Sequence, residues 1–131
     1  MYSHRLFTDT GDWIARGGIT VPLAPLSRPG ARANLGARLT NTRSDPPWDY
    51  YLEYVTATEW NRGVPGMPYL LIRRTVDIPG VGQRPAYLAP LHFDQRAGAT
   101  AQLVEPSGNV QFDVEVSSLP GPIIMVTARP L

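Results

Sequence analysis

The two histidines are the side chains whose chemistry is most easily placed in this sequence. His92-Phe93-Asp94 puts an imidazole and a carboxylate on one face of an expected strand. In that arrangement Asp94 could orient His92 for proton transfer, or both side chains could ligate a metal ion. A catalytic zinc site commonly needs a further protein ligand, and the other histidine, His4, stands near the N-terminus. We therefore expect a surface histidine beside a carboxylate, with no metal and no cofactor.

Asp9-Thr10-Gly11 resembles the short signature of the aspartic proteases. The resemblance implies a homodimeric hydrolase in which two carboxylates share one proton. A tight turn, in which the carboxylate of Asp9 accepts hydrogen bonds from the backbone, explains the same residues better. The sequence contains no Gly-x-Ser-x-Gly motif and no cysteine. We therefore predict a protein that is not an enzyme and has no catalytic residue, with a small hydrolase as one alternative.

An aromatic group lies near the middle of the chain and consists of Trp48, Tyr50 and Trp60, with Arg62 beside it. Strand alternation would put Trp48, Tyr50 and Tyr54 on one face. Tyrosine, tryptophan and arginine are enriched in protein interfaces, and exposed aromatic rings can also stack on sugars. A hydrophobic core closed by the two tryptophans is the third interpretation. The core is favoured over an interface, and an interface over a carbohydrate platform.

Positive charge is concentrated at the start of the chain. All 12 basic residues are arginine, and no acid occurs between Trp13 and Ser44. Within this region, residues 21–48 are rich in proline, so we expect an extended arm or long loop there. Its proposed interface residues are Arg28, Arg32, Arg38 and Arg43, which would contact an acidic surface, for example on a neighbouring copy. A solvated loop without a partner is the alternative.

Strands must position these residues, because the 14 prolines exclude long helices. Alternation over 110–116 predicts a half-buried strand, and a Pro-Ser-Gly-Asn turn is expected to join 110–117 to 99–105 in an antiparallel hairpin. Pro90 places the strand expected at 86–93 at a sheet edge or bulge. Further strands are expected at 3–8, 18–23, 49–57, 69–78 and 123–129, the last of them central. This pattern predicts an all-β, single-domain fold over residues 1–131: an antiparallel β-sandwich or jelly roll with a Pro-rich extended arm or loop at about 21–48.

The remaining bulk properties fit a globular protein with a single core. The chain has 131 residues, of which 43% are hydrophobic, so it can bury one core without disulfides. It shows neither a secretory signal nor a membrane-spanning apolar stretch. Its pI of about 8.1 lies below the roughly 9 typical of nucleic-acid binders, so direct nucleic-acid binding is not expected.

These properties lead to an expected function. We expect a non-catalytic structural or assembly protein that forms homo-oligomers and binds other subunits of a larger assembly. The most specific expectation is a bacteriophage virion component of the capsid-decoration or head–tail joining type, located in the virion or the cytoplasm. The alternative is a carbohydrate- or ligand-binding β-module that uses the surface aromatics.

Overall fold

The computed structural model describes residues 6–25, 34–43, 47–55, 68–94, 96–105, 109–117 and 123–131, with the backbone alone at 76–78 and 83–88. Strands account for most of this part of the chain. They are β1 (Leu6–Asp9), β2 (Ile19–Leu23), β3 (Gly36–Asn41), β4 (Trp48–Val55), β5 (Tyr69–Ile78), β6 (Gly82–His92), β7 (Thr100–Glu105), β8 (Val110–Val116) and β9 (Ile124–Pro130). A short helix, α1 (Asp12–Ala15), lies between β1 and β2.

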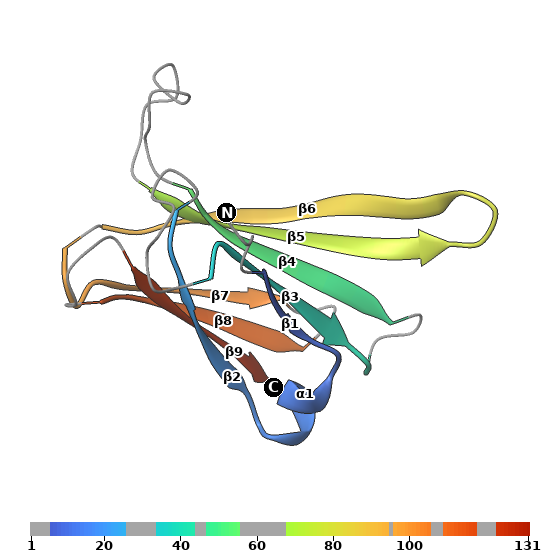
Figure 1. Ribbon diagram of the computed structural model, residues 1–131, viewed down its shortest axis with the longest axis horizontal. Helices are drawn as coiled ribbons and strands as arrows, with labels where there is room; N and C mark the ends of the chain where they lie inside the picture. The colour runs from blue at the N-terminus through green and yellow to red at the C-terminus, as the bar shows by residue number, and fades with distance from the viewer. Residues whose placement is uncertain are drawn as a thin grey trace, which may run out of the picture.

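The strands form two sheets, which lie one above the other in Figure 1. The first sheet has five strands in the order β1-β3-β4-β5-β6. Adjacent strands in this sheet are antiparallel, except that β1 and β3 run parallel to each other. The second sheet has four antiparallel strands in the order β2-β9-β8-β7. The prediction of an all-β fold built from mostly antiparallel sheets is therefore confirmed.

The inward side chains of the two sheets meet in one hydrophobic cluster. In β8 the residues Val110, Phe112, Val114 and Val116 are buried and alternate with more exposed polar residues, as the sequence predicts. From the other sheet, the ring of Tyr50 meets that of Phe112 edge-on, with 5.2 Å between the ring centroids. Burial of such alternating apolar residues makes the largest favourable contribution to the free energy that keeps the two sheets packed together.

Several predicted elements have the expected partners. Strands β7 and β8 form the predicted antiparallel hairpin, and β9 lies between β2 and β8, which makes it a central strand. Strand β6, which contains Pro90, is an edge strand of the first sheet. Its register against β5 shifts between Ile72 and Arg73, so a bulge lies close to the proline. Proline has no N–H to donate to a neighbouring strand. An edge strand tolerates this because one of its sides has no neighbouring strand to bond.

The expected arm at 21–48 needs a correction. Its first residues belong to β2 and Gly36–Asn41 form β3, which lies between β1 and β4, so the expectation of a loop is wrong there. Ala37, Leu39 and Asn41 are buried with the period of a strand, but the buried set consists of one small, one large apolar and one polar residue, so the apolar alternation is weak in the sequence. Residues 26–33 and 44–46 lie outside the described part of the chain.

The connection between the first two strands is longer and more structured than a turn alone. It contains α1, and the strands that it connects belong to different sheets. Trp13 of this helix is fully buried, and its indole N–H donates to the carbonyl oxygen of Thr40 at 3.0 Å. The helix therefore crosses from one sheet to the other and contributes a large side chain to the core between them.

Candidate interaction surface

Asp9-Thr10-Gly11 forms the tight turn that the sequence favours. The Asp9 carboxylate accepts hydrogen bonds from the backbone N–H groups of Gly11 at 2.9 Å and Trp13 at 3.1 Å. It also forms an ion pair with Arg16 at 2.8 Å. Partial burial raises the pKa of Asp9, but the hydrogen bonds from Gly11, Trp13 and Arg16 outweigh it and hold the pKa below the usual 3.8. The carboxylate thus has a structural role at the start of α1.

Replacing Asp9 by alanine is expected to lower the free energy of unfolding by about 1–2 kcal/mol, because the backbone N–H groups of Gly11 and Trp13 lose the carboxylate that accepts their hydrogen bonds. Because the folded-state pKa lies below 3.8, this contribution is present at higher pH and is lost as the pH falls through the folded-state value. Urea unfolding at pH 7 and pH 3 measures both effects. The control is Asp12→Ala, an exposed acid three residues further on, at the start of α1; equal losses for the two variants would contradict this role.

His92 and Asp94 are placed differently from the predicted pair. The exposed ring of His92 packs against the edge of Tyr69, with 5.3 Å between ring centroids. The Asp94 carboxylate accepts hydrogen bonds from the backbone N–H of Arg96 at 3.1 Å and from its Nε at 2.9 Å. No group of metal-ligating side chains is found among the residues that the structure describes.

The aromatic group is divided between core and periphery. Trp48, Tyr50 and Tyr54 share the inward face of β4, as predicted, and the fully buried Tyr50 makes the expectation of a ligand platform wrong for that residue. Trp48 is half-buried, with the guanidinium of Arg74 4.5 Å from its ring centroid. Tyr50 therefore belongs to the interior, and Trp48 lies at its border. Trp60 and Arg62 lie outside the described residues.

The predicted interface arginines that the structure describes make contacts within the subunit. Arg38 projects from β3 and binds the Asp49 carboxylate through Nε at 3.0 Å and Nη2 at 2.7 Å. Arg43 donates from Nη2 to the carbonyl oxygens of Asn109 at 3.2 Å and Leu131 at 3.3 Å. Arg38 and Arg43 therefore connect different parts of the same subunit. Arg28 and Arg32 lie outside the described residues.

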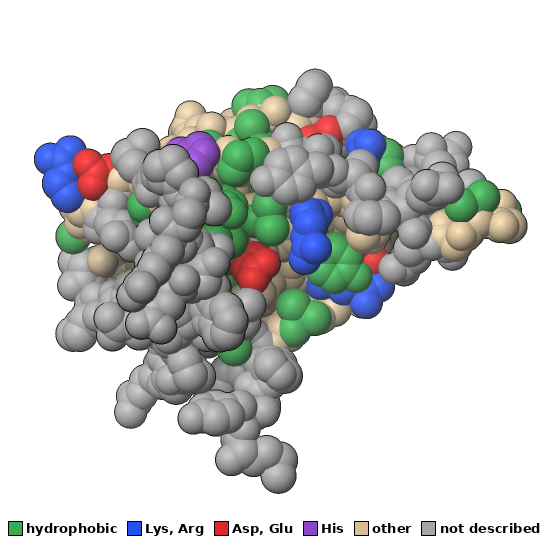
Figure 2. Space-filling model, turned by 90° about the horizontal axis from the view of Figure 1, so that it is seen from above, with side chains coloured by type: hydrophobic (Ala, Val, Ile, Leu, Met, Phe, Trp, Pro, Cys, Tyr) green, Lys and Arg blue, Asp and Glu red, His purple; other side chains and the backbone are tan. Residues whose placement is uncertain are grey.

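The outer face of the first sheet brings together exposed and half-exposed residues, of which the sequence analysis singled out only Arg38 and His92. On this face Tyr51 lies between Arg38 and Arg73, and Tyr69 lies opposite His92. The Arg38 guanidinium is 5.8 Å from the Tyr51 ring centroid. We call this surface the aromatic–arginine face; its residues are Arg38, Tyr51, Glu53, Tyr69, Leu71, Arg73 and His92. Figure 2 shows it from above, with hydrophobic, arginine, acidic and histidine side chains close together.

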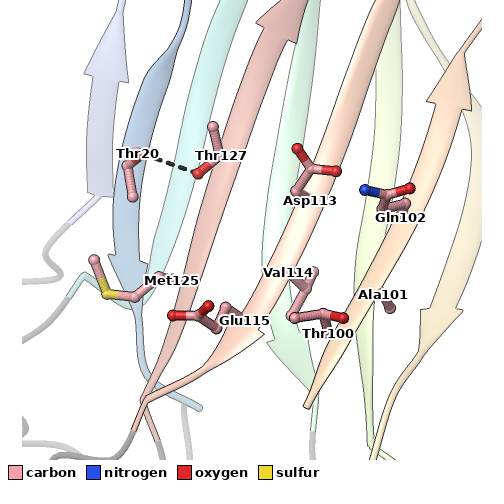
Figure 3. A pocket seen from close by; sticks show the side chains of 9 residues that line it. All are labelled: Thr20, Thr100, Ala101, Gln102, Asp113, Val114, Glu115, Met125 and Thr127. Atoms are coloured by element: carbon pink, nitrogen blue, oxygen red, sulfur yellow. Dashed lines mark hydrogen bonds between the residues drawn. The ribbon is translucent and has the colours of Figure 1, made fainter. Parts of the chain in front are cut away.

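The outer face of the second sheet has a different chemistry. It contains a shallow concavity of about 450 Å³ (Figure 3). Thr20 and Thr127 share a hydrogen bond of 2.9 Å across the strands, and Asp113 forms an ion pair with Arg129 at 2.5 Å. The concavity is lined by Thr20, Thr100, Ala101, Gln102, Asp113, Val114, Glu115, Met125 and Thr127. Short polar and acidic side chains predominate here, where the first sheet carries tyrosine and arginine.

Comparisons of the chain with protein family models, with curated proteins and with solved structures find no match. Among the described residues, no helix has the length and apolar character needed to cross a membrane.

Proposed function

We propose that this protein is a non-catalytic subunit of a larger protein assembly and contacts its neighbours through the aromatic–arginine face. The observation that carries this proposal is the unequal chemistry of the two sheet faces. Tyrosine and arginine are the residue types most enriched at interface hot spots, whereas threonine and acidic residues are depleted or under-represented there. One face therefore has the composition of a contact surface and the other has that of a solvated one.

Two side chains of the aromatic–arginine face, those of Arg38 and Tyr51, are held by contacts within the subunit. Asp49 holds the guanidinium of Arg38, which in turn lies against the ring of Tyr51. Side chains fixed before binding lose less conformational freedom when a partner arrives, so more of the contact energy appears as affinity. Arg73, next to Tyr51 across the strand pair, is exposed and can meet an acidic or carbonyl-rich partner surface.

The finer proposal is a virion component of the capsid-decoration or head–tail joining type, present in many copies. It is supported by general features of the chain: a small β-rich protein without cysteine, in which every basic residue is arginine. Such a subunit would be found in the virion and, before assembly, in the cytoplasm. Arg28 and Arg32 remain proposed contact residues of the same assembly.

We also propose that the fold is a β-sandwich. The shared core of the two sheets supports two stacked layers. Strands β3, β4, β5 and β6 follow one another in sequence and in space, as do β7, β8 and β9. This order is that of meanders, which favours a sandwich over a jelly roll built from two Greek keys.

A carbohydrate-binding module is the second candidate function. Its platform would be Tyr51 and Tyr69, whose rings are half-buried on the outer face, since Tyr50 lies in the core. The hydrolase alternative is less favoured, because the Asp9 carboxylate accepts backbone hydrogen bonds in the turn before α1.

The test of the proposed function is co-sedimentation. The tagged chain is expressed in its natural source, and the particles that carry it are separated on a density gradient. The double variant Tyr51→Ala/Arg73→Ala is expected to leave the particle fraction, with an affinity loss of at least about tenfold at low salt that becomes smaller as salt screens the charge of Arg73 in the wild type. The double variant Thr20→Ala/Thr127→Ala, on the other outer face, serves as the control and should remain bound.

Two results would contradict the proposal. One is a wild-type chain that stays at the top of the gradient as a free protein. The other is a folded Tyr51→Ala/Arg73→Ala variant that sediments like the wild type. A free chain whose tyrosine fluorescence changes on addition of glycans would support the carbohydrate-binding candidate instead. The pair Arg28→Ala and Arg32→Ala, tested in the same gradient, separates the contribution of the arginine-rich segment from that of the face.

A further inference from the structure

Strand β7 forms an open border of the second sheet. In the part of the chain that the structure describes, β8 is its one paired neighbour (Figure 1). The other border strands carry features that discourage pairing with foreign strands: β6 contains Pro85 and Pro90, β2 contains Pro22, and β1 has four residues. By contrast, β7 has neither a proline nor, from Thr100 to Val104, a charge.

The backbone groups of β7 that point outward can be identified from its hydrogen bonds. The N–H of Val116 donates to the carbonyl oxygen of Ala99 at 2.9 Å, so odd-numbered residues of this segment face β8. Hydrogen bonding alternates along an antiparallel strand. Thr100, Gln102 and Val104 therefore direct their N–H and C=O groups toward the open border.

The side chains along this border are incompletely covered. Ala101 and Leu103 are only half-buried, although their cross-strand partners Val114 and Phe112 are at most 1% exposed. Val104 is 53% exposed. An added strand would cover apolar surface here and would satisfy the outward backbone groups at the same time.

We propose that β7 pairs antiparallel with β7 of a second copy of this chain, about a two-fold axis at Gln102. This register uses all the outward-directed backbone groups and forms about six hydrogen bonds between the chains. It places Gln102 opposite Gln102 of the second copy, Thr100 opposite Val104, and Ala101 opposite Leu103. Polar or small residues thus meet uncharged ones, and no like charges face each other within this stretch.

The symmetry of this pairing argues for a second copy over an unrelated strand. In an isologous contact each molecule covers the open border of the other, so both borders disappear at once. An unrelated strand would cover one border and expose a new one. The pairing is independent of the proposed function, because it uses the second sheet and leaves the aromatic–arginine face of both copies free.

Disulfide trapping tests the register. The chain contains no cysteine, so a disulfide in Gln102→Cys can form only between two molecules. Residues that face each other as a hydrogen-bonded pair have Cα atoms about 5.5 Å apart, which suits a disulfide. We expect Gln102→Cys to form a covalent dimer under mild oxidation at least about tenfold faster than Thr20→Cys, an exposed position on β2 at the opposite border. Equal rates would overturn the proposal.

A proline variant tests the hydrogen bonds. Gln102→Pro removes an N–H that points outward, so the pairing with β8 stays intact, and the dissociation constant of the dimer is expected to rise about 100-fold. The control is Thr20→Pro on β2. The carbonyl of Pro22, two residues further along this strand, accepts from the N–H of Asn34 and hence faces away from β9. The N–H of Thr20 therefore faces away from β9 as well. Sedimentation equilibrium with circular dichroism measures association and folding.

Two outcomes of this measurement would overturn the proposal. One is a wild-type chain that is monomeric up to about 1 mM, a concentration at which a dimer of millimolar affinity would be half-formed. The other is a folded Gln102→Pro variant whose dimer has the same dissociation constant as that of the wild type. Should Gln102→Pro fail to fold, the comparison of the two cysteine variants decides the question by itself.

Discussion

Replacing Trp13 with alanine is expected to lower the free energy of unfolding by about 3–5 kcal/mol, a large part of the roughly 5–15 kcal/mol typical of a domain. The side chain is 0% exposed and belongs to the core cluster, so its removal leaves a cavity between the sheets. The Thr40 carbonyl oxygen also loses the hydrogen bond that it accepts from the indole N–H. Urea unfolding monitored by circular dichroism measures the loss.

Trp13→Phe is the matched control for this variant. It keeps an aromatic ring in the core but removes the indole N–H, so we expect a loss nearer 1–2 kcal/mol, from the smaller volume and the unpaired carbonyl. The order wild type, Trp13→Phe, Trp13→Ala in falling stability is the expected outcome. A Trp13→Ala protein within about 1 kcal/mol of the wild type would show that α1 does not contribute to the core in solution.

Replacing Tyr50 with phenylalanine is expected to cost about 2–3 kcal/mol, because it breaks a buried polar contact between the sheets. The Tyr50 hydroxyl donates to the Glu105 carboxylate at 2.9 Å and accepts from the Asn41 side-chain amide at 3.3 Å. Both partners are buried, so each loses a hydrogen bond that water cannot easily replace. Tyr51→Phe is the control, since that tyrosine is its neighbour on the outer face of the same strand.

The same contact makes stability depend on alkaline pH. Burial, together with the nearby Glu105 carboxylate, raises the pKa of Tyr50 to about 12, in spite of the opposing hydrogen bonds from Asn41 and Trp48. An unfolded tyrosine titrates near 10, so the folded state holds the phenolic proton more tightly. The stabilisation is therefore complete below pH 10 and is lost as the pH rises from 10 to about 12. Unfolding midpoints between pH 8 and 12 should fall less steeply for Tyr50→Phe than for Tyr51→Phe.

Alternation identified the strands in which each face has a consistent chemistry. In β8 every inward residue is apolar and every outward one is polar, so sequence and structure agree residue by residue. In β3 the buried set includes Asn41, and the segment is bounded by prolines, so the pattern resembled a loop. Helix α1 has four residues, too few for a helical period to be recognised, and the burial of Trp13 depends on both sheets.

The candidate surface was harder to predict than the fold. Alternation correctly separated Tyr50 from Tyr51, but it does not tell which of the two faces inward, because that is decided by the position of the other sheet. The grouping of Tyr51 with Arg38 and Arg73 depends on the register of three neighbouring strands. Spacing along the chain does not determine that register, since loops of different length can support the same pairing.

The hydrogen bond between Tyr50 and Glu105 has a mechanical consequence for β7. Apolar packing is non-directional, so on its own it would let one layer slide over the other. Glu105 ends β7, and its bond to a residue of β4 pins that end of the strand to the opposite layer at one fixed point. This end of β7 is therefore held against the opposite layer by a directional contact as well as by apolar packing.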